Sequence, residues 1–106
     1  MGAPYSVTIT TSPTRIVDYS PNRTVVMIYN NSDVTVYIGV GKGVSTTNGF
    51  PLRSQQAIVL AKEFGDDPTL SYYAIVESGT ADVRVWEGYG KTTGKILEEI
   101  LEQMRR

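Results

Sequence analysis

Apolar and polar residues alternate with a period of two through most of residues 5–87. Tyr5, Val7 and Ile9, for example, are separated by hydroxyl residues, a pattern that predicts a strand with one buried face. Similar short segments recur about every 8–12 residues, with turn residues between them. Six or seven strands are predicted, over residues 5–11, 15–17, 23–29, 34–40, 57–61, 70–76 and 81–87.

Two of the turn segments predict hairpins. Residues 30–33 (N-N-S-D) have side chains that mimic backbone hydrogen bonds, and they lie between the strand patterns 23–29 and 34–40. Residues 77–80 (E-S-G-T) lie in the same way between the last two strand patterns, and residues 48–52 (N-G-F-P-L) predict a further turn. Because no helical pattern separates the strands, the predicted fold class is all-β, an antiparallel β-sandwich or jelly-roll-like domain.

Near the C-terminal end the periodicity changes from two to 3.6. Apolar residues there follow the spacing i, i+1, i+4, i+5 and i+8, which is one stripe of an amphipathic helix. The stripe consists of Ile96, Leu97, Ile100, Leu101 and Met104. The predicted organisation is a β-domain over residues 1–88, a glycine-containing linker over 89–94 and an amphipathic helix over 95–106.

The helical stripe needs a surface to cover, because a helix of about 13 residues is marginal by itself in water. It can fold back on its own domain or pack on a second copy, and the flexible linker in front of it favours the second copy. Burial of the five side chains would contribute about 7–15 kcal/mol before ordering costs. The stripe is therefore the predicted interface of a homo-oligomer.

Composition argues against several classes of function. The 106 residues include no Cys and no His, which excludes disulfides, thiolate metal ligands and the usual general base near neutral pH. Ten basic and eleven acidic residues are scattered, so no basic cluster predicts binding to nucleic acid. No apolar run has the length of a membrane span, and the first residues lack the layout of a secretory signal. We expect a protein that is not an enzyme and has no metal, cofactor, nucleic-acid or membrane partner.

Aromatic residues suggest an alternative function. Tyr37, Tyr73 and Trp86 lie on the polar-facing sides of predicted strands, where rings can stack on sugars or pack in a subunit contact. Ordinary sheet packing accounts for the same rings. A third reading pairs Glu77 and Glu87 as the carboxylates of a glycoside hydrolase, which requires them to lie about 5–10 Å apart. Nothing in the sequence brings them together, and the alternative retained is a carbohydrate-binding module.

Five short sequence motifs follow one another in an order that resembles the order in a known group of proteins. An N-x-S turn at residues 30–32 leads to V-Y-I-G at 36–39, and an N-G-x-P-L corner follows at 48–52. A late Y-A-I-V segment at 73–76 then precedes V-R-V at 83–85. This order resembles that of small β-sandwich structural proteins of tailed phages and related viruses. The group includes capsid decoration, head-fibre and tail-associated modules.

The resemblance implies a virion component that attaches to a symmetric shell or tail. It also implies that the late Y-A-I-V and V-R-V strands pair, and that the partners are other virion proteins or copies of the chain itself. The helical stripe is not part of the pattern, so the resemblance assigns it no role. The predicted function is a non-enzymatic virion structural protein that forms a homo-oligomer, with the carbohydrate-binding module as the alternative.

Overall fold

The computed structural model describes residues 4–89, which contain eight β-strands and one short 3₁₀-helix. The first four strands are β1 (Tyr5–Ile9), β2 (Thr14–Val17), β3 (Arg23–Asn30) and β4 (Val36–Gly39). The remaining elements are β5 (Phe50–Leu52), β6 (Ala57–Ala61), η1 (Lys62–Phe64), β7 (Tyr72–Val76) and β8 (Ala81–Tyr89). The helix predicted over residues 95–106 lies outside the described residues.

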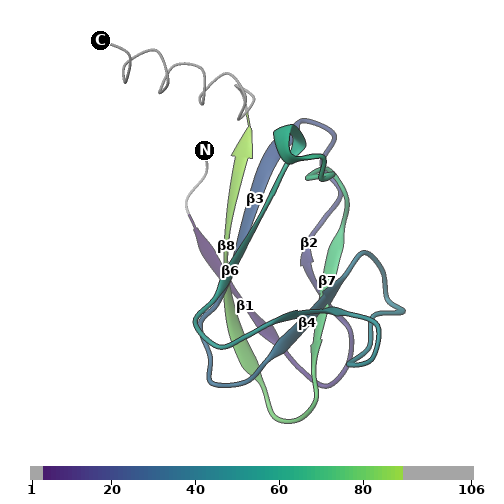
Figure 1. Cartoon of the computed structure of the whole chain (residues 1–106), viewed down its shortest axis with the longest axis vertical. Helices are drawn as coiled ribbons and strands as arrows, with labels where there is room; N and C mark the ends of the chain where they lie inside the picture. Colours follow the sequence, from purple (N-terminus) through teal and green to yellow (C-terminus); the bar gives the residue numbers. More distant parts are fainter. Residues whose placement is uncertain (1–3, 90–106) are drawn as a thin grey trace.

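The strands form two antiparallel sheets of four strands each. Sheet A has the order β1-β8-β3-β6, and sheet B has the order β2-β7-β4-β5. Figure 1 shows the chain passing repeatedly from one sheet to the other. Among the described strands, only β4 and β5 are neighbours both in sequence and in a sheet. Nearly all strand pairing therefore joins distant parts of the chain.

One hydrophobic core fills the space between the two sheets, and both sheets contribute to it. Strand β3 shows how the alternation builds this core, because Val26 and Ile28 are fully buried while Met27 between them is half-buried on the outer face. Val36 of β4 and Val76 of β7 supply buried side chains from the opposite sheet. Each such aliphatic side chain contributes about 1.5–3 kcal/mol when fully buried. The predicted all-β class with antiparallel strands is confirmed.

Both predicted hairpins are wrong. Strands β3 and β4 belong to different sheets, and so do β7 and β8. The Y-A-I-V strand accordingly pairs with β2 and β4 rather than with the V-R-V strand. The reason is that a period of two fixes which side chains face the core, but does not fix which strand becomes the neighbour. A turn-rich segment can carry the chain across the core as well as back along one sheet.

Asn30 stabilises the first of these connections between the sheets, which leads from β3 to β4. Its side chain is fully buried, and its Nδ2 donates to the carbonyl oxygens of Val34 at 2.7 Å and Leu52 at 2.9 Å. Its Oδ1 accepts from the Ser32 hydroxyl at 2.5 Å, and its backbone N–H donates to the carbonyl of Gln56 at 2.8 Å. One side chain thus connects the end of β3 in sheet A with β5 in sheet B.

Strand β5 replaces part of the turn predicted over residues 48–52. It lies at the edge of sheet B, where Pro51 is opposite Tyr37. An edge strand tolerates proline because one side of it needs no ladder hydrogen bonds. Residues 4–89 therefore contain eight strands, where the sequence predicts six or seven. At the other end of the chain, β8 continues to Tyr89, one residue beyond the predicted domain boundary at residue 88.

Candidate functional site

The outer face of sheet A has a band of exposed apolar side chains. Met27 of β3 lies at its centre and is paired with Trp86 of β8 on one side and Val59 of β6 on the other. Trp86 is 41% exposed and Val59 is 43% exposed, so both side chains meet solvent. Val25 and Tyr29 are half-buried on the same face of β3 and lengthen the band along that strand. These five residues are called the apolar band below.

A small hollow of about 90 Å³ opens beside the apolar band. It is lined by Pro4, Met27, Tyr29, Arg84, Val85 and Trp86. The Arg84 Nε donates to Asp82 at 2.9 Å, and both of these side chains are well exposed. The band is thus uncharged along its centre and has charge at its border. This distribution is typical of a surface that contacts another protein segment.

A buried arginine lies at one end of the core. The Arg23 side chain is 1% exposed, and its Nη1 donates to Glu87 at 2.7 Å and to the Asp18 carbonyl at 3.0 Å. Its Nε donates to the carbonyl of Pro68 at 2.6 Å, and its Nη2 donates to that of Leu70 at 2.7 Å. The guanidinium therefore joins strand β8 to the two loops that precede β3 and β7.

Three side chains donate to the Glu87 carboxylate. The Tyr5 hydroxyl donates at 2.8 Å and the Tyr89 hydroxyl at 3.0 Å, in addition to Arg23. Partial burial alone would raise the pKa of Glu87, but these hydrogen bonds and the guanidinium charge outweigh it and lower the pKa. Burial, followed by the hydrogen bond to Glu87, raises the pKa of Tyr5. This carboxylate is therefore engaged by structural partners from three strands of sheet A.

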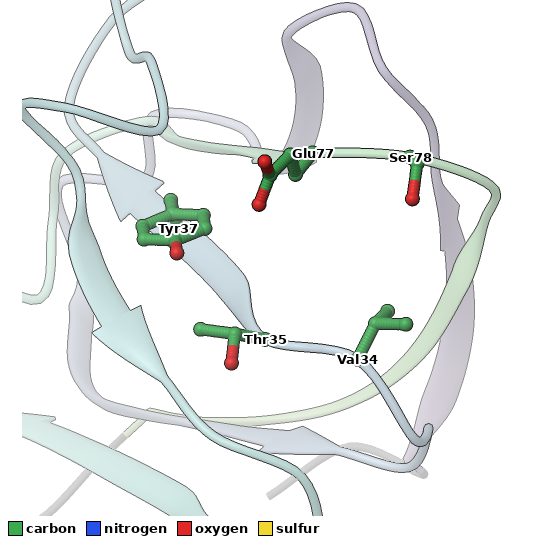
Figure 2. A pocket seen from close by; sticks show the side chains of 5 residues that line it. All are labelled: Val34, Thr35, Tyr37, Glu77 and Ser78. Carbon is green, nitrogen blue, oxygen red and sulfur yellow. The ribbon is translucent and has the colours of Figure 1, made fainter.

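A polar notch of about 220 Å³ lies where the β7–β8 loop meets the start of β4 (Figure 2). Its lining consists of Val34, Thr35, Tyr37, Glu77 and Ser78. Figure 2 shows the Glu77 carboxylate directed toward the Tyr37 ring, with Thr35 and Ser78 around the same opening. An aromatic ring, a carboxylate and two hydroxyls provide stacking and hydrogen bonding for a small polar ligand. We call this feature the Tyr37 notch.

The backbone of Gly49 lies very close to Tyr37. A Cβ at residue 49 would lie 2.7 Å from the Tyr37 Cβ and 2.9 Å from the Ser45 carbonyl oxygen. The Gly49 N–H also donates to that carbonyl at 2.9 Å. The Asn-Gly pair that predicts a turn therefore also allows the loop to approach the tyrosine closely.

The structure does not bring the three predicted stacking residues together. Tyr37 and Tyr73 share the outer face of sheet B, where Tyr37 is paired with Ile75 and Tyr73 with Gly39. Trp86 lies on the outer face of sheet A, on the other side of the core. A single platform of three rings is thus not formed. Tyr37 belongs to the notch, and Trp86 belongs to the apolar band.

Glu77 and Glu87 also lie apart. Glu77 follows the end of β7 and lines the notch, near the start of β8 at Ala81. Glu87 is near the opposite end of β8, roughly 20 Å from Ala81 at the usual strand rise of about 3.3 Å per residue. It is bonded there to Arg23. The close carboxylate pair that a glycoside hydrolase requires is not formed by these two residues.

The interface residues predicted on the helical stripe are the remaining candidates. Ile96, Leu97, Ile100, Leu101 and Met104 lie outside the described residues.

No protein-family model matches this chain. Searches among curated proteins and solved structures likewise found no significant match. Within residues 4–89, no helix is long and apolar enough to cross a membrane. The same part of the chain has no group of three or more acidic, His or Cys side chains placed to hold a metal ion. The functional interpretation therefore depends on the geometry of the described residues.

Two features of the site were missed by inspection of the sequence. Arg23 reads as an ordinary strand-starting residue, because its acceptors at Pro68, Leu70 and Glu87 are distant in the chain. The apolar band does have a sequence signal. Residues 25–29 and 57–61 are apolar at successive positions, so both faces of these strands carry apolar side chains. That signal indicates that the outer faces of both strands are apolar, but it does not indicate that the two strands are neighbours in one sheet.

Proposed function

We propose that this protein is a non-enzymatic structural component of a virion that assembles as a homo-oligomer. The observation that carries the proposal is the apolar band on sheet A. Trp86, Met27 and Val59 form a continuous row across three strands, and two of them are more than two-fifths exposed. A contiguous apolar patch with a polar border is a mark of an interaction surface. The same chain has a second apolar surface on its predicted helical stripe.

The strand order supports this proposal at the level of architecture. Two four-stranded sheets ordered β1-β8-β3-β6 and β2-β7-β4-β5 correspond to a β-sandwich of the jelly-roll type. Viral capsid domains and lectins both use this architecture. A fold hosts many functions, so the argument for assembly depends on the apolar surfaces. The resemblance of the sequence motifs to phage structural proteins is the reason for assigning the assembly to a virion.

Light scattering tests the assembly directly. The full chain should have a mass that is a multiple of the 11.7 kDa chain mass. The double substitution Leu97→Asp with Leu101→Asp should reduce the mass to that of one chain, because burying an unpaired carboxylate is strongly unfavourable. The control is Glu99→Ala with Gln103→Ala, which has the same spacing outside the stripe and should leave the mass unchanged. A monomeric full chain, or an oligomer unaffected by the two aspartates, would contradict the proposal.

A carbohydrate-binding module is the second candidate, and the Tyr37 notch is the observation that favours it. An exposed carboxylate beside a ring and two hydroxyls matches the hydroxyl groups and apolar ring face of a sugar. The notch of about 220 Å³ limits the ligand to roughly one sugar ring.

Titration with monosaccharides, followed by amide chemical shifts, tests this second candidate. We expect shifts confined to residues 34–37 and 77–78, because these residues line the notch. Tyr37→Ala should abolish them through loss of the stacking ring. Tyr73→Ala should preserve them, since Tyr73 is on the same sheet face but does not line the notch. Absence of shifts with neutral and amino sugars alike would remove the candidate.

A further inference from the structure

The apolar band lies close to Tyr89, the last described residue of strand β8. We infer that residues 95–106 of a neighbouring copy cover the apolar band. This inference rests on the homo-oligomer proposed above and adds the surface on which each C-terminal segment docks. The occupant is thus a second copy of this chain, bound through Ile96, Leu97, Ile100, Leu101 and Met104.

Length and position agree with this assignment. Strand β8 extends to Tyr89, roughly 10 Å beyond Trp86 and next to Gly88, which is paired with Val25 of the band. Residues 90–94 can span at most about 17 Å. A helix over residues 95–106 would be about 18 Å long, and a four-stranded sheet is about 14 Å wide between its outer strands. The segment is therefore long enough to cross the whole band.

The centre of the apolar band is chemically suited to an apolar stripe. The centre of the apolar band has Trp86, Met27 and Val59 without an intervening charge. A cation lies opposite an aromatic ring on both outer faces, since Arg84 is paired with Tyr29 toward one end of the band and Arg15 is paired with Tyr73 on sheet B. An apolar stripe docked over the centre of the band therefore removes apolar side chains from water without a charged side chain between them.

Each copy offers one apolar band and one C-terminal segment. If a segment covered the band of its own domain, neither apolar surface would remain for assembly. Exchange of segments between copies makes the same contacts and links the chains, which is a low-cost route to an oligomer. Because we propose a homo-oligomer, we assign each C-terminal segment to the apolar band of a neighbouring copy.

Trp86 provides a direct probe, because it is the single tryptophan of the chain and belongs to the band. In the full chain its emission should lie at shorter wavelength than in the Leu97→Asp, Leu101→Asp variant. Its quenching by acrylamide should be weaker by about twofold or more, since docking takes the ring out of water. Glu99→Ala with Gln103→Ala should retain the emission of the unaltered chain.

A mixing experiment distinguishes a neighbour's segment from the chain's own. Full-length Trp86→Phe protein supplies intact segments without tryptophan fluorescence, and the Leu97→Asp, Leu101→Asp variant supplies Trp86 with a disabled segment. Incubating the two together should move the emission of the second protein to shorter wavelength. The full chain alone could emit at shorter wavelength than the aspartate variant while mixing leaves the emission of that variant unchanged. This result would mean that each segment covers its own band, and would overturn the inference.

Failure of the inference can be separated from failure of the proposed function. An oligomer by light scattering, with Trp86 emission unaffected by the two aspartates, would place the docking surface elsewhere while leaving the assembly intact. A monomeric full chain would overturn both. Oligomer formation together with a Trp86 shift on mixing supports both.

Discussion

Replacing Arg23 with methionine should destabilise the protein by about 3–5 kcal/mol, the cost typical of removing one partner from a buried ion pair. Methionine keeps most of the apolar stem but leaves Glu87 and three backbone carbonyls without the guanidinium. A domain of this size is usually stable by only about 5–15 kcal/mol, so the loss is a large part of the total. Urea unfolding at pH 7 measures the change.

Arg84→Met is the matched control for this prediction. Arg84 is also on sheet A and also pairs with a carboxylate, at 2.9 Å, but its side chain is 53% exposed. Solvent screens such a pair, and its loss should cost about 1 kcal/mol or less. Arg23→Lys keeps the charge but not the four-way geometry, and should fall between the two. Equal unfolding free energies for Arg23→Met and Arg84→Met would show that burial of the guanidinium contributes nothing.

Asn30→Leu should lower the unfolding free energy by about 2–4 kcal/mol. The leucine has a similar size, but it removes the Nδ2 donor from the carbonyls of Val34 and Leu52 and the Oδ1 acceptor from the Ser32 hydroxyl. Each buried polar group that loses its partner costs about 1–3 kcal/mol. Amide hydrogen exchange should also accelerate in β5, because Asn30 is the side chain that connects this edge strand to β3. Denaturant unfolding and exchange together measure both effects.

The neighbouring Asn31→Leu change provides the comparison. Asn31 is half-buried, and its Nδ2 makes one hydrogen bond, to Asp82 at 3.0 Å. Its replacement should cost about 1 kcal/mol, the usual net value of a single hydrogen bond. If both asparagine variants were equally stable, the buried side chain would not be what holds the crossing between the sheets.

The local alternation of residues determined which side chains enter the core. Val26, Ile28 and Val83 are buried as a period of two requires, because successive side chains of an extended strand point to opposite faces. The strand patterns predicted over residues 5–11, 57–61 and 70–76 contain β1, β6 and β7 for the same reason. This information is local, and a reader of the sequence alone can recover it.

Residues 48–52 and 77–80 show the limit of local information. The first segment contains Asn-Gly and Pro, which read as a turn, yet Phe50–Leu52 pairs with β4 at the sheet edge. The second segment reads as a hairpin turn but connects strands of different sheets. Turn chemistry specifies a change of direction, whereas the neighbour of each strand depends on contacts between residues far apart in the chain.

The candidate sites divide in the same way. The sequence by itself identified Tyr37 and Trp86 as outward-facing rings, since each alternates with core residues along its strand. Only the tertiary structure decided that they lie on opposite sheets, that Trp86 joins Met27 and Val59 in one band, and that Glu87 is held by Arg23. The physical reason is that alternation is a property of one strand, whereas a surface or a buried ion pair arises from the order and register in which several strands pack.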